Sequence, residues 1–414
     1  MKNSNKQCNL SSCNNSRTNK SRNARKTNYI KINRIKFIGS ALTSLLLFPV
    51  LLSCTSNLNN TASAQENKNK PGQTSQDTIA PVKKDTISIV AVGDIMLGSA
   101  YPSKSNLPPD DAVGSFKNVA SYLKGDIVFG NLEGCFLNNG KSTKCKDTIG
   151  NSCFAFRMPE RYANIYKEAG FNLLSVANNH VGDFGLKGRK RSAQLLDSLE
   201  IKYAGLTSHP YTIFEKDSIK YGFCAFAPNE NTVSINQIDS AKALVAFLKK
   251  QVNIVIVSFH GGGEGARFEH VPRANEIFYK ENRGNVYAFS HAVIDAGADI
   301  VLGQGPHVTR AVEVYKNKFI AYSLGNFCTY GQFSLKGPNG FAPLLTIKLN
   351  GQGDFLYADV LSVKQDKINR LTLDQNQTAM QKIISLTDAD FPGHNLSFTN
   401  NRIIQKKQLN QPSN

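Results

Sequence analysis

Short apolar, β-branched runs alternate with helical patterns along most of this 414-residue chain. The runs lie at 87–92, 126–129, 173–177, 254–257 and 300–302. Runs of this length and composition predict strands. Strands that alternate with helices are typical of an α/β fold. We therefore predict a mixed α/β body.

Apolar residues at helical spacing occupy segments between these strands. One of these segments opens at Pro159 and stops at Gly170, two residue types that mark helix starts and ends. The predicted helices span 113–123, 159–170, 195–199, 238–251 and 286–296.

A different pattern follows Val308. Four apolar runs succeed one another, with turn residues at Lys316-Asn317 and Asn350-Gly351. Such runs predict successive antiparallel strands. They span 311–315, 319–323, 344–349 and 356–363. We expect the polar tail at 401–414 to be flexible.

Short polar signatures lie where predicted strands end and loops begin. In open α/β sheets, ligand sites assemble at the carboxyl ends of strands, so we expect these segments to converge. The signatures are Gly93-Asp94-Ile95-Met96-Leu97-Gly98, Gly130-Asn131-Leu132-Glu133, Asn178-Asn179-His180 with Asp183, Phe259-His260-Gly261-Gly262 with Glu264, and Gly303-Gln304-Gly305-Pro306-His307.

The side chains of these signatures are suited to a divalent metal. Carboxylate, amide oxygen and imidazole together favour Mn, Fe or Zn, as one ion or two. A metal of this kind polarises a phosphoryl or acyl oxygen and activates a bound water. The candidate metal ligands are Asp94, Asn131, Glu133, Asn179, His260 and His307.

The first 53 residues are predicted to be a signal segment. They contain ten Lys or Arg and no Asp or Glu, and they end in an apolar run at 37–52. A basic segment, a short apolar run and a small residue indicate an export signal, because the run is short for a membrane span. Cys54 follows Ser53 and resembles the lipidated cysteine of a bacterial lipoprotein. The alternative is an uncleaved signal anchor.

Composition changes after Cys54. Residues 54–85 are polar with almost no large apolar side chains, which predicts a disordered tether.

The signal carries ten of the net +18 charges, so 39 Lys and Arg remain against 31 Asp and Glu, a net +8. This mild excess, spread without long blocks, gives little support to nucleic-acid binding, and we expect no nucleic-acid partner.

The chain has eight cysteines, and three of them lie close together in one loop. Cys135, Cys145 and Cys153 follow the Glu133 signature, and in an exported protein two of the three can form a bridge. The sequence does not choose the pair. Cys224 and Cys328 lie in apolar runs and are predicted to be buried thiols.

Three further polar residues are candidates for binding substrate. Arg157 precedes Met158-Pro159 and is suited to an anionic group, although a buried ion pair is an equal alternative. Glu264 and His270 follow the His260 signature and are candidates for lining a cleft. Asp183 is expected to form a turn or to support a neighbouring ligand. We expect structural roles for His209, His291 and His394.

The ordered signatures resemble the bacterial capsule-synthesis CapA family, also called poly-gamma-glutamate capsule proteins. Glu313-Val314-Tyr315 and Tyr322-Ser323-Leu324-Gly325-Asn326-Phe327 extend the match, and the CapA-like domain is predicted at 86–400. The resemblance implies a calcineurin-like metallophosphoesterase-type fold. That fold is a single domain in four layers, with two facing mixed β-sheets flanked by helices. It also implies catalytic roles for Asp94 and His180, with His180 as the acid that protonates a leaving group.

Three positions depart from the phosphoesterase pattern. Met96 stands where a histidine is usual, Asn131 stands where a bridging carboxylate is usual, and Gln304-Gly305 replaces a second histidine. Fewer anionic and imidazole ligands favour a site with one metal, a weakly bound metal or none. Similarity of fold alone does not establish catalysis.

Three functions remain open from the sequence. The first is a metal-dependent hydrolase or transferase acting on a phosphoester or amide of an envelope polymer. The second is a non-catalytic capsule-assembly or export subunit that holds a polyanion such as poly-gamma-glutamate. The third, a solute-binding lipoprotein, lacks the usual two-lobed symmetry. In each case we expect a lipid-anchored body outside the cytoplasm, and capsule-synthesis subunits are candidate partners of the first two.

Overall fold

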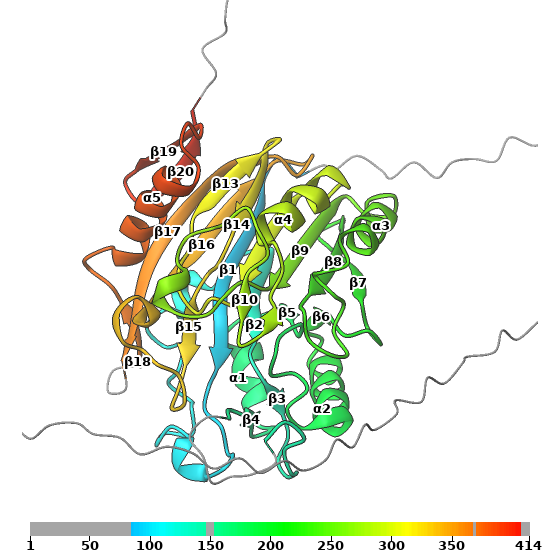
Figure 1. The fold of residues 1–414 in the computed structure, drawn as a ribbon, viewed down its shortest axis with the longest axis vertical. Coiled ribbons are helices and arrows are strands. Elements are labelled where there is room, and N and C mark those ends of the chain that lie inside the picture. The colour runs from blue at the N-terminus through cyan, green and yellow to red at the C-terminus, as the bar shows by residue number, and fades with distance from the viewer. Residues whose placement is uncertain (1–83, 146–152, 367–369, 407–414) are drawn as a thin grey trace, which may run out of the picture. The chain divides into compact units, whose positions relative to one another are not determined.

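The predicted strand runs lie at the centre of two large sheets in a computed structural model of the protein (Figure 1). The structure describes residues 84–145, 153–366 and 370–406. The signal segment, Cys54 and nearly all of the predicted tether lie outside the described residues. The described residues fall within a single compact unit. Within them, no helix is long and apolar enough to cross a membrane.

The larger sheet has ten strands and is mixed. Its parallel part runs outward from β1 through β2 and β5 to β6, and its antiparallel part begins where β16 pairs with β1. Its strands are β1 (Ile87–Met96), β2 (Ile127–Leu132), β5 (Leu173–Ser175), β6 (Lys202–Ala204), β15 (Asn326–Thr329), β16 (Phe341–Leu349), β17 (Phe355–Asp366), β18 (Arg370–Leu373), β19 (Leu396–Thr399) and β20 (Arg402–Gln405).

The smaller sheet has six strands, in the order β13-β14-β12-β9-β8-β7. Its four central strands run parallel, and β13 and β7 are antiparallel at the edges. The strands are β7 (Tyr211–Lys216), β8 (Ile219–Phe226), β9 (Ile254–His260), β12 (Ile300–Gln304), β13 (Val312–Tyr315) and β14 (Lys318–Ala321). Two short pairs complete the strands: β3 (Cys135–Phe136) with β4 (Arg157–Met158), and β10 (Ile277–Phe278) with β11 (Glu281–Asn282).

Helices α1 to α4 cover the outer faces of the sheets, whereas α5 also packs into the core between them. One core cluster joins the ten-stranded sheet to α1 and α2, a second joins the six-stranded sheet to α3 and α4, and a third fills the space between the sheets. The α-helices are α1 (Tyr162–Glu168), α2 (Gly185–Ser198), α3 (Ile238–Lys249), α4 (Val286–Asp295) and α5 (Thr378–Asp390). Short 3₁₀ helices lie at Lys104–Asn106, Ala120–Tyr122, Ala266–Phe268 and Gly337–Gly340. The predicted class, two facing mixed sheets flanked by helices in one domain, is confirmed.

The sequence of β1 shows why these strands read as continuous apolar runs. Ile87, Ile89 and Ala91 point into the core between the two sheets. Val90 and Val92 point to the opposite face and pack in the cluster that contains the helices. A strand buried on both faces carries apolar side chains on both of them, so no regular alternation with polar residues is visible.

Several predicted elements differ in the structure. The helix predicted at 113–123 is a series of turns with backbone bonds three residues apart, ending in the short 3₁₀ helix. Its apolar stripe is only partly buried, since Val113 is 76% exposed. The late strands do not form one antiparallel set, because β13–β14 and β16–β17 belong to different sheets. The predicted flexible tail begins with β20, which pairs with β17 and β19.

Candidate metal centre

Asp94 is fixed at the end of β1 by a close approach of two backbone segments. A Cβ at Gly93 would lie 1.9 Å from the carbonyl oxygen of Gly325, so only glycine fits there. The backbone N–H of Asp94 donates to that same carbonyl at 2.8 Å. The pairing of β1 with β2 is irregular between Ala91 and Asp94. After the irregularity Asp94 lies opposite Asn131, so its carboxylate is at the end of β2. The Asp94 side chain is fully buried.

Asn131 and Glu133 arrive beside Asp94 from the end of β2. The Asn131 amide donates through Nδ2 to Asp94 Oδ1 at 2.8 Å and to Glu133 Oε2 at 2.5 Å. Its oxygen accepts from Asn178 Nδ2 at 3.1 Å. Asn131 therefore holds the two carboxylates together through its nitrogen, while the sequence predicted a metal ligand through the oxygen.

His260 completes a cluster that could hold a metal ion. Ligand atoms of Asp94, Glu133 and His260 all lie within 4.8 Å of one another, and all three side chains are buried. Neither ring nitrogen of His260 has a hydrogen-bond partner among the described residues, nor does Glu133 Oε1. Buried polar atoms without partners are costly and uncommon. A cation between these groups would satisfy them, so the donor set fits a divalent metal.

The pKa shifts of Glu133 and His260 also favour a bound cation. Burial raises the pKa of Glu133 to about 8, and the neighbouring charge of Asp94 adds to the effect. Burial lowers the pKa of His260 well below its ordinary value of 6.5, and nearby cations lower it further. A neutral imidazole keeps a free lone pair, which metal ligation requires. Two carboxylates that repel each other beside a neutral imidazole favour a bound cation.

His307 approaches Asp94 from the loop after β12. Its Nδ1 lies 2.8 Å from Asp94 Oδ2, and its backbone is left-handed with φ of 58°. Burial alone would lower the pKa of His307, but the hydrogen bond and charge of Asp94 outweigh it and raise the pKa to about 9. Of the predicted imidazole ligands, His260 is without hydrogen bonds within the described part of the chain, whereas His307 is already paired.

His180 lies on the other side of Glu133 and has a different set of partners. Its Nδ1 lies 2.7 Å from Asp183 Oδ2, and that oxygen also accepts the backbone N–H of Phe156 at 2.7 Å. Its Nε2 lies 3.9 Å from Glu133 Oε1. Burial lowers the pKa of His180, and the Asp183 charge opposes that effect. Asp183 thus supports His180, as the sequence suggested.

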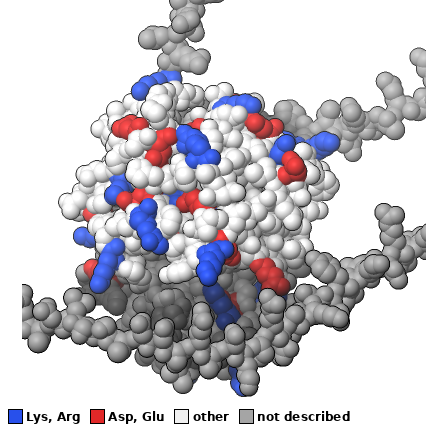
Figure 2. Space-filling model, viewed as in Figure 1, with Lys and Arg blue, Asp and Glu red and all other residues white. Residues whose placement is uncertain are grey.

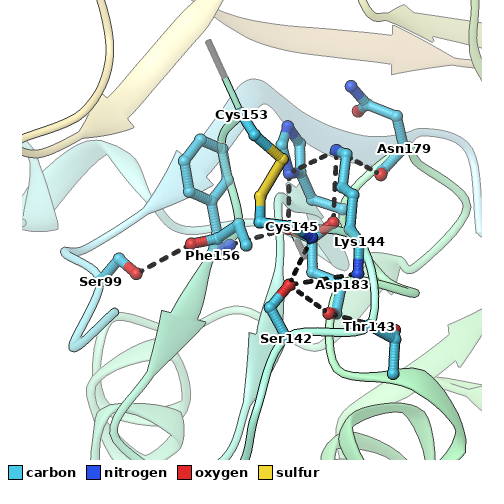
Figure 3. The surroundings of a disulfide bond; sticks show 11 residues. Ser99, Ser142, Thr143, Lys144, Cys145, Cys153, Phe156, Asn179 and Asp183 are labelled. Atoms are coloured by element: carbon cyan, nitrogen blue, oxygen red, sulfur yellow. Dashed lines mark hydrogen bonds and ion pairs between the residues drawn. A yellow bond between two sulfur atoms is a disulfide. The ribbon is translucent and has the colours of Figure 1, made fainter. Parts of the chain in front are cut away.

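Lys144 is a charged neighbour of His180 that the sequence did not single out. Its ammonium lies 3.3 Å from Asp183 Oδ1 and donates to the backbone oxygen of Asn179 at 3.2 Å. Figure 3 shows this lysine beside the disulfide that joins Cys145 to Cys153. The open choice among three cysteines is thereby settled, and Cys135 is a buried thiol. Cys224 and Cys328 are also buried thiols, as predicted.

A pocket of about 310 Å³ opens next to His180 and His307. Its wall is aromatic: Phe156 stacks on His180 with ring centres 4.0 Å apart, and the Phe333 ring centre lies 5.3 Å from that of His307. Glu264 lines the pocket and pairs with Arg283. The cluster of Asp94, Glu133 and His260 therefore has an adjoining space in which a substrate can bind.

Other predicted site residues lie elsewhere or have other partners. Arg157 donates to the backbone oxygens of Gly140 and Ala100, at 2.7 and 3.1 Å, and does not line the pocket. His270 is exposed and pairs with Asp390 at 2.6 Å. Asn179 lines two neighbouring pockets, and its buried side-chain oxygen has no partner in the described part of the chain.

Two more residues at the site were missed by sequence reasoning. Asn178 is fully buried and accepts the backbone N–H groups of His180 and Val181, at 3.0 and 2.9 Å. It belongs to the Asn-Asn-His signature, so its position was available as a signal. Arg283 pairs with Glu264 and Glu281 and has no motif around it.

The family model described as bacterial capsule synthesis protein PGA_cap matches residues 88–330. This range holds every residue of the cluster and more than half of the chain. The chain belongs to the PGA_cap family. The resemblance drawn from the ordered signatures is confirmed, and those signatures supply the buried groups around His260.

Relatives of this PGA_cap protein include two named CapA. The capsule biosynthesis protein CapA of Bacillus anthracis is 30% identical over 277 residues, which cover 61% of this chain and 62% of that relative. The PGA biosynthesis protein CapA of Bacillus subtilis is 25% identical over 333 residues, which cover 74% of this chain and 82% of that relative. The match therefore spans less than two thirds of the length of the Bacillus anthracis protein.

Similarity to solved structures is weaker. A hypothetical protein from Thermus thermophilus aligns with 14% identity and a TM-score of 0.41, covering 68% of this chain and 100% of that chain. The two facing sheets of this PGA_cap protein are assigned from the strand pairing of the chain itself, and not from this similarity.

Proposed function

We propose that this PGA_cap protein is a metal-dependent hydrolase or transferase acting on a phosphoester or amide of an envelope polymer. One observation carries the proposal: both ring nitrogens of His260 are buried without hydrogen-bond partners among the described residues, although ligand atoms of His260, Asp94 and Glu133 lie within 4.8 Å of one another. A purely structural histidine in such a place would be expected to use at least one nitrogen in a hydrogen bond.

Asp94, Glu133 and His260 would hold the metal, with His307 and Asn179 as neighbouring candidates. One or two ions of Mn, Fe or Zn suit this set of oxygen and nitrogen ligands. Such a metal would polarise a phosphoryl or acyl oxygen and lower the pKa of a bound water.

His180 is the proposed proton donor to the leaving group. Its Nδ1 is held by Asp183, which leaves Nε2 as the atom available to a substrate. The stacked ring of Phe156 keeps the imidazole in one orientation. The Asp183 charge stabilises the protonated imidazole against the effect of burial, which a general acid requires.

The envelope polymer and the location of the protein are part of the same proposal. The names of the two Bacillus relatives refer to capsule or PGA biosynthesis, which supports an anionic capsule polymer such as poly-gamma-glutamate as substrate. We infer a body held outside the cytoplasm by a lipid on Cys54, with capsule-synthesis subunits as partners.

Replacing Cys54 by Ala should release the body into a soluble exported fraction. Labelled fatty acid that still attaches to the C54A protein would rule this out.

A second function is favoured by specific residues. Met96 is buried and offers a thioether where a histidine is usual, and its sulfur accepts the backbone N–H of Gly98 at 3.3 Å. Gln304 donates to the backbone oxygen of Val92. These residues reduce the number of strong ligands and favour a non-catalytic subunit that holds the polymer.

The two functions are separated by a turnover assay on the full chain. Purified protein is incubated with Mn, Fe or Zn and with aryl phosphoesters, alkyl phosphoesters and gamma-glutamyl amides. Metal-dependent turnover of any of these supports the enzyme. Polymer binding without turnover of any of them, under every metal, supports the assembly subunit.

A further inference from the structure

Helix α2 carries a cluster of cations close to the proposed site. Four of five successive residues are basic, namely Lys187, Arg189, Lys190 and Arg191. The only acidic residue of the helix is Asp197, at its far end. Arg191 is paired with Glu160 at 2.7 Å.

The other three cations have no carboxylate partner within the described residues. Lys187 and Lys190 are three residues apart and exposed, so they lie on the same solvent-facing side of the helix. Arg189 lies on its flank and turns toward the loop that follows β5. A Cβ at Gly182 would lie 3.3 Å from Arg189 Nη1, which places the guanidinium against that loop.

Arg189 also lines a pocket of about 270 Å³ with Lys144 and Asn179. A second pocket of about 300 Å³ shares Lys144 and Asn179 with the first. The second pocket in turn shares His180 and Glu264 with the pocket of about 310 Å³ at the candidate metal centre. The three pockets are therefore neighbours that follow one another from Arg189 of α2 past His180, and we call this row of pockets the groove.

The charge along this groove is uneven. Glu264 and Glu281 are both paired with Arg283, and Asp183 is paired with Lys144. Glu264 and Glu281 share this one cation, and the exposed Glu230 lines the pocket near Arg189 without a cation partner among the described residues. The excess of positive charge therefore lies on the exposed side of α2 and not along the lining of the groove.

The groove therefore begins at a net positive surface. In the part of the molecule that Figure 2 leaves uncovered, blue and red side chains are interspersed. A run of unpaired cations that leads into a groove suits a ligand with repeated anionic groups.

We infer that the exposed side of α2, with Lys187, Arg189 and Lys190, is the docking surface for an anionic polymer chain. The polymer runs from α2 through the groove, so that one of its bonds lies at His180. The polymer is a polycarboxylate; this identity rests on the proposed function, whereas the surface itself rests on the charges and the groove. None of the three cations contacts the candidate metal cluster, so their role is in binding and not in chemistry.

The test compares two charge-matched triple variants of the full chain. The first is K187Q/R189Q/K190Q. The control is K220Q/K242Q/K250Q, which removes three cations in and around β8 and α3. Binding of poly-gamma-glutamate is measured by titration at several salt concentrations. Inorganic polyphosphate, single-stranded DNA and anionic phospholipid vesicles are titrated in parallel.

The first variant should bind poly-gamma-glutamate roughly tenfold more weakly and with a smaller salt dependence, because three screened ionic contacts are lost. The control should bind like the wild type. Equal binding by both variants would overturn the inference, as would stronger wild-type binding to polyphosphate, DNA or vesicles. Together with the turnover assay on the full chain, this titration separates the two proposals. If no substrate is turned over but the first variant loses polymer binding, the enzyme proposal fails and the docking surface stands.

Discussion

His180 and Asp183 are joined by a hydrogen bond of 2.7 Å between Nδ1 of the imidazole and Oδ2 of the carboxylate. The same oxygen accepts the backbone N–H of Phe156, so the carboxylate is fixed before it orients the imidazole. This arrangement leaves His180 Nε2 to face the space beside Glu133. The proposed proton transfer to a leaving group depends on this nitrogen.

Replacing His180 by Ala should leave the fold and polymer binding largely intact. Turnover should fall by about 10²–10⁴-fold, the usual contribution of positioned proton transfer. The loss should be steepest for alkyl phosphoesters or amides and small for nitrophenyl esters, because an activated leaving group hardly needs a proton. His270→Ala is the control, since His270 pairs with Asp390 away from the pocket. An equal loss with both kinds of leaving group would contradict the role of His180 as an acid.

Replacing Asp183 by Asn should shift the pH profile of turnover. The Asp183 charge raises the pKa of His180 against the effect of burial, so its removal should lower that pKa. The alkaline limb of the kcat profile should then move to lower pH. Asp388→Asn provides the matched control, because Asp388 pairs with His394 at 2.8 Å in the same way at the surface. An unchanged alkaline limb in D183N would show that Asp183 does not act through His180.

The metal-free protein should lose stability as pH rises from about 6.5 to 9. Glu133 has a pKa raised to about 8 and His307 a pKa raised to about 9, so in this range the folded state binds more protons than the unfolded state. The free energy of unfolding then falls with pH. Urea unfolding of metal-free wild type and Glu133→Gln should show a shallower decline in the variant. A free energy that rises over this range would contradict these assignments.

The buried pair of Arg310 and Glu276 should be important for stability. Two hydrogen bonds of 2.8 and 2.7 Å join the side chains, and Glu276 also accepts the backbone N–H of Gly263. Breaking a buried pair by removing one partner typically costs about 3–5 kcal/mol, and we expect a loss of that order for Glu276→Ala. Asp359→Ala breaks an exposed pair with Arg402 and should have little effect. Equal midpoints of denaturant unfolding in the two variants would contradict the expectation.

The sequence predicted the strands that carry the site, because strands buried on both faces leave a continuous apolar run that is easy to recognise. It also placed Asp94, Glu133 and His260 at strand ends, where the fold brings them together. It did not predict the partners of these groups. Asn131 uses its nitrogen, and Lys144 reaches His180 from a distant loop. Both facts depend on tertiary distances that no local pattern encodes.

The errors have physical causes as well. The pattern at 113–123 has helical spacing, but its backbone hydrogen bonds join residues three apart instead of four, and Val113 is left in solvent. For Arg157 the sequence left contact with an anionic substrate and a buried ion pair as equal alternatives. In the structure its guanidinium ties two loops together through their carbonyl groups.

The metal content of the purified protein is the direct test of whether Asp94, Glu133 and His260 hold a metal. Protein made in metal-rich medium should contain a divalent transition metal, and Asp94→Ala or His260→Ala should lower the content. His209→Ala should not, because His209 stacks on Tyr203 outside the cluster, with ring centres 4.4 Å apart. A wild type without bound metal, or equal metal content in all three variants, would contradict the account.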